Sequence, residues 1–282
     1  MDSGCDLTGR EAVDLPRVGD ERTSGERNHA DAMAVPPRHP TQASTDACIE
    51  KRTAFQYHRA VRELRPGLWH WGAPHPDWQP SEPWHQEVSS YAIDDGERLL
   101  LFDPIAVPEQ MEELAGSRET AVVLTAPWHE RDARALVERL GVPVFAPLPE
   151  SAADLMQKYG ITREQAGDGS PDLAWLRAGD VGEAHWYSAG DRPLAGIQAF
   201  PSRETNEVVL WVENYRAVIA GDTLVDFGEG LEIPAVWLRE GVTREQVVEG
   251  LRPLLEFPVE HVLETHGGPT DRAALERALS SS

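Results

Sequence analysis

Short apolar runs alternate with amphipathic segments along most of the chain. Runs typical of buried strands occupy 88–93, 98–102, 120–125, 142–146, 196–200, 207–212, 217–220 and 259–264. Apolar residues three to four positions apart predict helices over 108–115, 130–140, 150–159, 243–255 and 270–279. An Asp-Asp-Gly turn at 94–96 predicts a hairpin between the first two runs. Because hairpins are interleaved with strand–helix pairs, the pattern predicts a mixed α/β fold with more than one sheet.

Two parts of the chain lack this strong pattern. Residues 1–55 mix charged residues with Ser, Thr, Gly and Pro, so we expect a disordered N-terminal extension before a single domain over 56–282. Between 161 and 195 the pattern predicts only short strands, around 173–177 and 185–187.

The charge balance narrows the classes of partner. The 282 residues include 26 basic and 48 acidic side chains, for a formal net charge of -22. Such an acidic chain repels phosphates and anionic lipids, so neither nucleic acid nor a membrane is an expected partner. With no signal-like N-terminus and no apolar run of about 18 residues, we expect a soluble, cytoplasmic protein.

Motifs for several common chemistries are missing from the sequence. Both cysteines, Cys5 and Cys48, precede the patterned region, so a thiolate zinc site and a cysteine nucleophile are excluded there. No Gly-x-Ser-x-Gly elbow, phosphate-binding loop or dinucleotide fingerprint occurs. Serine hydrolases, nucleotide hydrolases and nicotinamide enzymes therefore lack support.

Four segments, taken in order, carry a family resemblance. One strand ends in Asp103-Pro104, and the next is followed by Thr125-Ala126-Pro-Trp128-His129-Glu130-Arg131. Further on come Pro201-Ser-Arg203, then Gly221-Asp222-Thr-Leu and Thr265-His266-Gly. In this order and spacing, residues 66–278 resemble the metallo-β-lactamase fold superfamily. The resemblance implies a four-layer α/β/β/α sandwich with a hydrolytic metal site at one sheet edge.

The resemblance also identifies metal-ligand positions, and most of them are substituted. Where the family has histidines, this chain has Ala126, Trp128, Arg131 and Arg203; where it has the helix aspartate, this chain has Glu130. Methyl, indole and guanidinium groups do not coordinate a cation. Only Asp222 and His266 keep the family's residue type.

Two interpretations of this degenerate metal site stay open. Glu130, Asp222 and His266 form a weak three-ligand site for one divalent metal, such as zinc, iron or manganese. Alternatively no metal binds, and Arg131 and Arg203 form salt bridges with Asp222 and Glu130. Two guanidinium groups near a divalent cation favour the second interpretation.

A segment rich in tryptophan and histidine provides further candidates. Residues 67–85 hold four of the nine tryptophans and three of the ten histidines, and by the resemblance they form one wall of the pocket. The pocket candidates are Trp128, Arg131, Arg203, Asp77 and Trp78, and the acid–base candidates are Asp222, His129 and His75. Core packing is the alternative role for Trp69, Trp71 and Trp84.

Two functions fit these observations. One is a hydrolase-like enzyme that acts on a small-molecule ester, thioester or lactone, as the resemblance implies. The other is a catalytically inert, metal-free protein that binds a small anionic or aromatic ligand. In both cases the expected partner is a small molecule.

Overall fold

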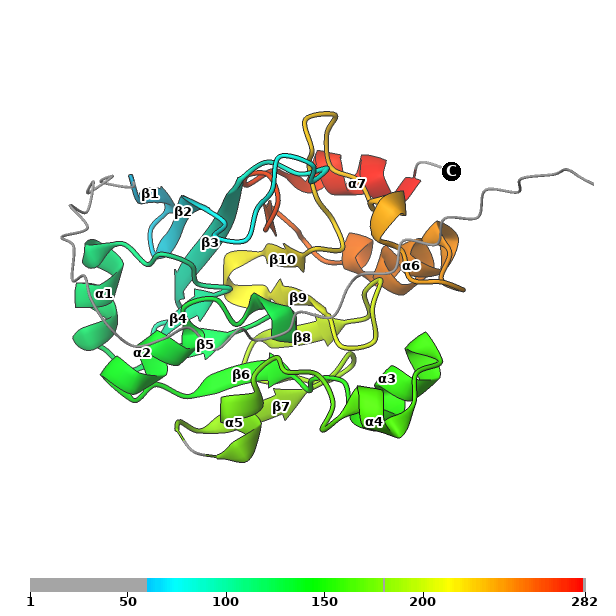
Figure 1. The fold of residues 1–282 in the computed structure, drawn as a ribbon. Helices are drawn as coiled ribbons and strands as arrows, with labels where there is room; N and C mark the ends of the chain where they lie inside the picture. The colour runs from blue at the N-terminus through cyan, green and yellow to red at the C-terminus, as the bar shows by residue number, and fades with distance from the viewer. Residues whose placement is uncertain (1–59, 180, 281–282) are drawn as a thin grey trace, which may run out of the picture. The chain divides into compact units, whose positions relative to one another are not determined.

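The computed structural model describes residues 60–179 and 181–280. The extension predicted over 1–55, and the start of the domain predicted at 56, lie outside these ranges. Within them, the strands form a seven-stranded and a four-stranded sheet (Figure 1).

The larger sheet contains the N-terminal strands in chain order. They are β1 (Arg62–Arg65), β2 (Leu68–Pro74), β3 (Glu87–Asp94), β4 (Leu99–Phe102), β5 (Thr120–Val123), β6 (Val144–Pro147) and β7 (Ala184–Tyr187). Strands β1 to β4 pair antiparallel, and β4 to β7 pair parallel. The parallel strands are joined by helices, because a parallel crossover needs a long connection.

The smaller sheet has the order β11-β10-β9-β8. Its strands are β8 (Ile197–Phe200), β9 (Val209–Val212), β10 (Ala217–Gly221) and β11 (His261–Glu264). Strand β11 runs parallel to β10, so both end at the same sheet edge. The residues that follow these two strands therefore lie close together.

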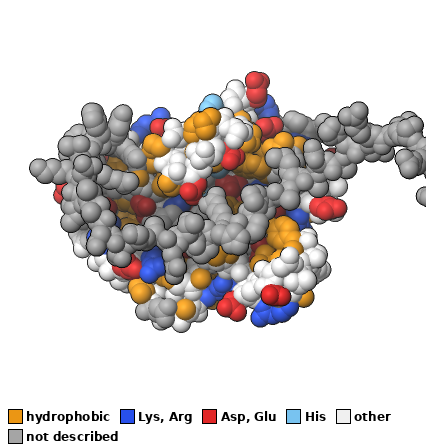
Figure 2. Space-filling model, in the orientation of Figure 1, with side chains coloured by type: hydrophobic (Ala, Val, Ile, Leu, Met, Phe, Trp, Pro, Cys, Tyr) orange, Lys and Arg blue, Asp and Glu red, His pale blue; other side chains and the backbone are white. Residues whose placement is uncertain are grey.

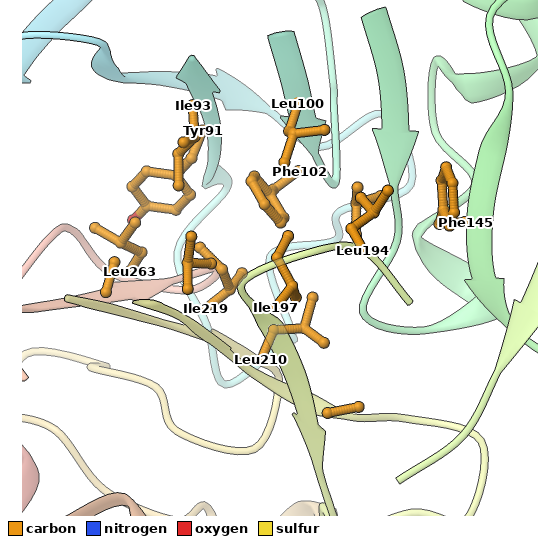
Figure 3. Packing of buried hydrophobic residues seen from close by; sticks show 14 of the residues in the cluster. Tyr91, Ile93, Leu100, Phe102, Phe145, Leu194, Ile197, Leu210, Ile219 and Leu263 are labelled. Carbon is orange, nitrogen blue, oxygen red and sulfur yellow. The ribbon is translucent and has the colours of Figure 1, made fainter. Parts of the chain in front are cut away.

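Alternate residues of each strand fill the space between the sheets. Figure 3 shows Tyr91, Leu100 and Phe102 of the larger sheet facing residues of the smaller one, including Ile197, Leu210, Ile219 and Leu263. Leu99 and Leu101 point to the opposite face, because successive side chains alternate along a strand. The run from Leu99 to Phe102 is apolar throughout because both of its faces are covered.

Helices cover the outer face of each sheet. The larger sheet packs against α1 (Glu109–Gly116), α2 (Ala133–Leu140) and α5 (Ala174–Ala178), and the smaller one against α6 (Arg244–Leu251) and α7 (Arg272–Ser280). The predicted four-layer α/β/β/α sandwich is thus confirmed. Helices α3 (Ala152–Tyr159) and α4 (Arg163–Ala166) lie together beyond β6 (Figure 1).

Short 3-10 segments complete the described chain: η1 (Pro127–His129), η2 (Glu213–Tyr215), η3 (Ala235–Trp237) and η4 (Arg252–Glu256). In the described residues no helix has the length and apolarity to cross a membrane.

The predicted hairpin over 88–102 is confirmed, and the strand predicted around 173–177 is wrong. That stretch forms α5, which starts after Leu173 in a left-handed conformation with φ 50°. A Glu130 carboxylate oxygen accepts a hydrogen bond from the Leu173 backbone N–H, which stabilises the helix start from outside the segment. Strands β1 and β2 lie outside the runs that the hydrophobic pattern predicts as strands.

Candidate functional site

Four residues that follow strands meet at one edge of the two sheets. Asp103 follows β4, Asp222 follows β10, and Thr125 and His266 come just after β5 and β11. The backbone N–H and the hydroxyl of Thr125 donate to the two carboxylate oxygens of Asp103, at 2.9 and 2.7 Å. Asp222 lies 3.4 Å from His266, and His129 lies between Asp103 and Asp222, so the four residues belong to the one sheet edge that the resemblance implies.

His129 occupies the centre of this edge and bridges two carboxylates. Its Nδ1 lies 3.2 Å from Oδ2 of Asp103, and its Nε2 lies 3.1 Å from Oδ1 of Asp222. The imidazole is only 3% exposed. Because each ring nitrogen faces a carboxylate, the geometry favours the doubly protonated imidazolium.

The titration behaviour of these groups reflects their mutual charges. Burial alone opposes the charge on His129, but Asp222 and Asp103 outweigh it and raise its pKa to about 9. Burial likewise opposes ionisation of Asp222 and Asp103, yet His129 lowers the pKa of both carboxyl groups below the ordinary value. At neutral pH the cluster therefore contains two carboxylates held by one imidazolium.

Arg203 adds a second positive charge beside Asp222. Its Nη2 lies 3.5 Å from Oδ2 of Asp222, and its Nε lies 3.3 Å from Oε2 of Glu207. The guanidinium also donates to the backbone oxygens of Asp222, at 3.2 Å, and Trp237, at 2.8 Å. The expected salt bridge between Arg203 and Asp222 is confirmed.

The buried carboxyl group of Glu207 holds the backbone turn that carries Asp222. Its Oε1 accepts a hydrogen bond of 2.8 Å from the Asp222 backbone N–H, and the residue is 1% exposed. Burial raises the pKa of its carboxyl to about 7, against the opposing effect of Arg203. Gly221 precedes Asp222 with φ 56°, and a Cβ there would come within 3.1 Å of the Glu207 carboxylate. The turn thus requires glycine.

Arg131 takes a different role from the one expected. Its Nη1 donates to the backbone oxygens of Asp103, at 2.8 Å, and Ser89, at 3.4 Å. Both Arg131 and Asp103 have positive φ, 41° and 44°, which is an unfavourable conformation for residues with a Cβ. The guanidinium thus ties together two strained turns.

Glu130 does not join the cluster. Glu130 follows η1 in a helical conformation, and its carboxylate accepts from the Leu173 N–H at the start of α5. The predicted pairing of Glu130 with an arginine is therefore wrong, and its predicted use as a metal ligand with Asp222 has no support in this geometry.

Trp128 and Ala126 occupy positions that the resemblance assigns to histidine ligands. The Trp128 indole N–H donates to Oδ2 of Asp222 at 3.0 Å, and its ring lies near the Arg203 guanidinium, 5.8 Å from ring centroid to Cζ. Ala126 is completely buried. The indole thus contacts the carboxylate directly.

Aromatic rings enclose His266 on the outer side of the cluster. The imidazole centroid lies 4.6 Å from Trp84, 5.1 Å from Trp237 and 6.4 Å from Phe227, all in edge-on arrangements. His266 Nδ1 is buried and has no hydrogen-bond partner among the described residues. Burial lowers the pKa of His266, so the ring is neutral at pH 7.

The segment around residue 75 reaches this aromatic enclosure through Trp84. His75 packs edge-on against Trp84 at 5.4 Å, and its Nδ1 accepts from the Asp77 backbone N–H. Asp77 itself is exposed, and Trp78 donates to the Trp84 backbone oxygen at 2.8 Å. Burial and the charge of Arg131 lower the pKa of His75. Of these residues, His75 and Trp84 lie on the His266 side.

The donor set does not fit the metal site that the fold implies. Asp222 is surrounded by His129, Trp128, Arg203 and His266 at 3.5 Å or less. No group of three or more His, Cys, Asp or Glu residues suited to a metal occurs within the described ranges. The guanidinium groups of Arg131 and Arg203 and the imidazolium of His129 already compensate the carboxylates. A divalent cation would therefore add positive charge that no carboxylate of the cluster balances.

Three contributors to the site were not among the sequence candidates: Asp103 and Glu207 as charge partners, and Trp237 as an aromatic wall. The spacing of Arg203 and Glu207 gives no signal for their ion pair, because residues 203–207 form a turn and not a helix. Trp237 gives no signal either, because it lies in a short 3-10 segment distant from the motifs.

Comparison with known structures identifies the fold. DIM-1 metallo-β-lactamase aligns with a TM-score of 0.55 at 12% identity, covering 79% of this chain and 96% of that one. A metallo-β-lactamase from Erythrobacter litoralis with β-mercaptoethanol in its active site aligns at 0.52 and 13%, covering 79% and 95%. VMB-1 at pH 5.5 aligns with the same values. The chain therefore has the metallo-β-lactamase fold.

No family model matches the sequence. No curated protein matches it either.

Proposed function

We infer that this protein is a metal-independent member of the fold that binds a small anionic or aromatic ligand. The observation that carries this inference is the double bridge of His129 between Asp103 and Asp222. His129 and Arg203 together supply the positive charge that balances these carboxylates, which would otherwise bind cations. Metal-assisted activation of water has no place in such a site.

The ligand position is the aromatic enclosure of His266. Trp84 and Trp237 supply ring edges, and the buried Nδ1 of His266 lacks a partner that a ligand would provide. Burial lowers the pKa of both His75 and His266, and the positive charge of Arg131 adds to this effect. An aromatic carboxylate matches this combination of rings and positive charge.

Elemental analysis and ligand titration test this function. Protein purified without chelator or added metal is expected to contain no stoichiometric zinc, iron or manganese, and a chelator leaves its melting temperature unchanged. Benzoate serves as the probe and is expected to quench tryptophan fluorescence. His266→Phe keeps the ring packing and weakens benzoate binding, whereas His185→Phe, on a partly exposed imidazole of β7, leaves it unchanged.

Stoichiometric metal that a chelator removes, with a lower melting temperature, contradicts the metal-independent function. Equal benzoate affinity of wild type and His266→Phe contradicts the assigned ligand position.

A second candidate is a metal-free hydrolase for an ester, thioester or lactone, and one observation favours it. His266 has Nε2 3.4 Å from Asp222 while Nδ1 stays unpaired and neutral, as in a general base oriented by a carboxylate. Nδ1 would accept a proton from water, the hydroxide would attack the carbonyl carbon, and the leaving alkoxide or thiolate would take the proton back. Hydrolysis of p-nitrophenyl acetate that persists in chelator and is lost in His266→Phe supports this candidate.

A further inference from the structure

A cleft of about 630 Å³ is lined in part by Trp237, and His266 is not among its lining residues. It is bounded by α3, by the loop before β9 and by the segment 236–240. Its volume falls within the range of about 300 to 1,000 Å³ typical of small-molecule sites. The proposed function above does not use this cleft.

One wall of the cleft is apolar and unusually exposed. Tyr159, at the end of α3, is 59% exposed, and Val236 in η3 is 73% exposed. Trp237 and Leu238 continue the same wall. Figure 2 shows hydrophobic side chains at the surface beside the α3–α4 region. Exposed aromatic and aliphatic groups that line one cleft favour a ligand with an apolar body.

Two adjacent residues bring opposite charges to the cleft. Arg239 has a buried Nε with no hydrogen-bond acceptor among the described residues. Glu240 is exposed, and no ion pair joins it to a described residue. In contrast, Lys158 is already held between Glu150 and Glu204, at 3.0 and 3.1 Å, and so is not available to a ligand. Arg239 and Glu240 are therefore the polar part of the cleft that is available to a ligand.

The charges of this pair select among ligand classes. A simple carboxylate would satisfy Arg239 but would face the negative charges of Glu240 and Glu204. A simple ammonium ion would be repelled by the positive charge of the Arg239 guanidinium, which lines the same cleft. A molecule that bears both groups satisfies both residues, because a charge-assisted hydrogen bond to each is stronger than a neutral one.

We propose that the cleft beside Trp237 binds a zwitterionic small molecule with an apolar body, of the class of free aromatic α-amino acids. The carboxylate pairs with Arg239, the ammonium group pairs with Glu240, and the side chain packs on Tyr159 and Val236. This cleft shares Trp237 with the enclosure of His266, but Arg239, Glu240, Tyr159 and Val236 belong to the cleft alone, so the proposal can be tested independently of the proposed function.

Calorimetric titration of the full chain with L-phenylalanine tests the proposal. N-acetyl-L-phenylalanine, which lacks the ammonium charge, and phenethylamine, which lacks the carboxylate, serve as matched ligands. L-phenylalanine is expected to bind about tenfold more tightly than either, since one charged hydrogen bond corresponds to about 10- to 100-fold in affinity.

Variants locate the binding. Arg239→Gln is expected to weaken binding of L-phenylalanine about 10- to 100-fold. Arg252→Gln is the control, because Arg252 is exposed and pairs with Glu249 outside this cleft. Circular dichroism spectra of both variants verify that they fold. Absence of binding by L-phenylalanine, equal binding of either single-charge ligand, or unchanged affinity in Arg239→Gln overturns the proposal.

Discussion

The indole N–H of Trp128 donates a hydrogen bond of 3.0 Å to the Oδ2 of Asp222. By the resemblance in sequence, position 128 corresponds to a histidine that would bind metal. The indole instead satisfies the carboxylate directly, as a donor and not as a ligand. The contact explains how a large aromatic residue is accommodated at the edge where both sheets end.

Replacement of Trp128 by Phe should weaken the fold. The phenyl ring retains most of the packing but leaves Asp222 without this donor, so we expect a loss of about 1–3 kcal/mol in the free energy of unfolding. Urea denaturation at pH 7 measures the change. An unchanged free energy of unfolding would show that Arg203 and His129 suffice for Asp222.

Removal of the Arg203 guanidinium should be more damaging. Arg203→Ala leaves the carboxylates of Asp222 and Glu207 buried with less compensation, and we expect a loss of about 3–5 kcal/mol. Arg252→Ala breaks an exposed pair with Glu249 and should change stability by less than about 1 kcal/mol. If urea denaturation gives equal losses for both variants, the Arg203 pairs do not stabilise the site.

His129 should make the stability depend on pH on the alkaline side. Its pKa of about 9 in the folded protein exceeds the ordinary value of 6.5, so its contribution is complete below about pH 6.5 and disappears as pH rises through 9. The difference corresponds to about 3 kcal/mol. We expect His129→Gln to lose less stability than wild type between pH 6 and 10 in urea denaturation.

His185→Gln is the control for this measurement, because His185 is partly exposed and pairs only with Glu183 among described acidic groups. It should lose as much stability as wild type over the same range. A parallel loss in His129→Gln would mean that other groups cause the alkaline effect.

Glu264 should oppose stability at neutral and alkaline pH. Its Oε2 is buried without a partner, and burial, assisted by the charge of Asp226, raises its pKa to about 8. Because the folded pKa exceeds the ordinary 4.5, the fold loses stability as pH rises from about 4.5 to 8. Glu264→Gln should therefore be more stable than wild type at pH 9. The difference in free energy of unfolding between the variant and wild type should be about 2–4 kcal/mol larger at pH 9 than at pH 5. Melting curves that differ equally at the two pH values would contradict this.

The sequence was more informative about the fold than about the contacts within the site. Asp103, Thr125, Asp222 and His266 could be expected at one sheet edge, because all four follow predicted strands that, by the family resemblance, end at one cleft. The partner of each charge could not. Glu130 accepts a hydrogen bond from the distant Leu173 N–H, and a contact of this kind leaves no trace in the hydrophobic pattern. The bridging role of His129 likewise depends on where Asp222 arrives from a distant strand.

The side-chain bridge at His129 also bears on how the protein is made. On the proposed metal-independent function, the central carboxylates are neutralised by residues of the same polypeptide, and the fold needs no metallation step after synthesis. Its maturation should then be insensitive to the zinc or iron supply of the producing cell. Growth in metal-depleted medium should yield as much folded protein as growth in rich medium.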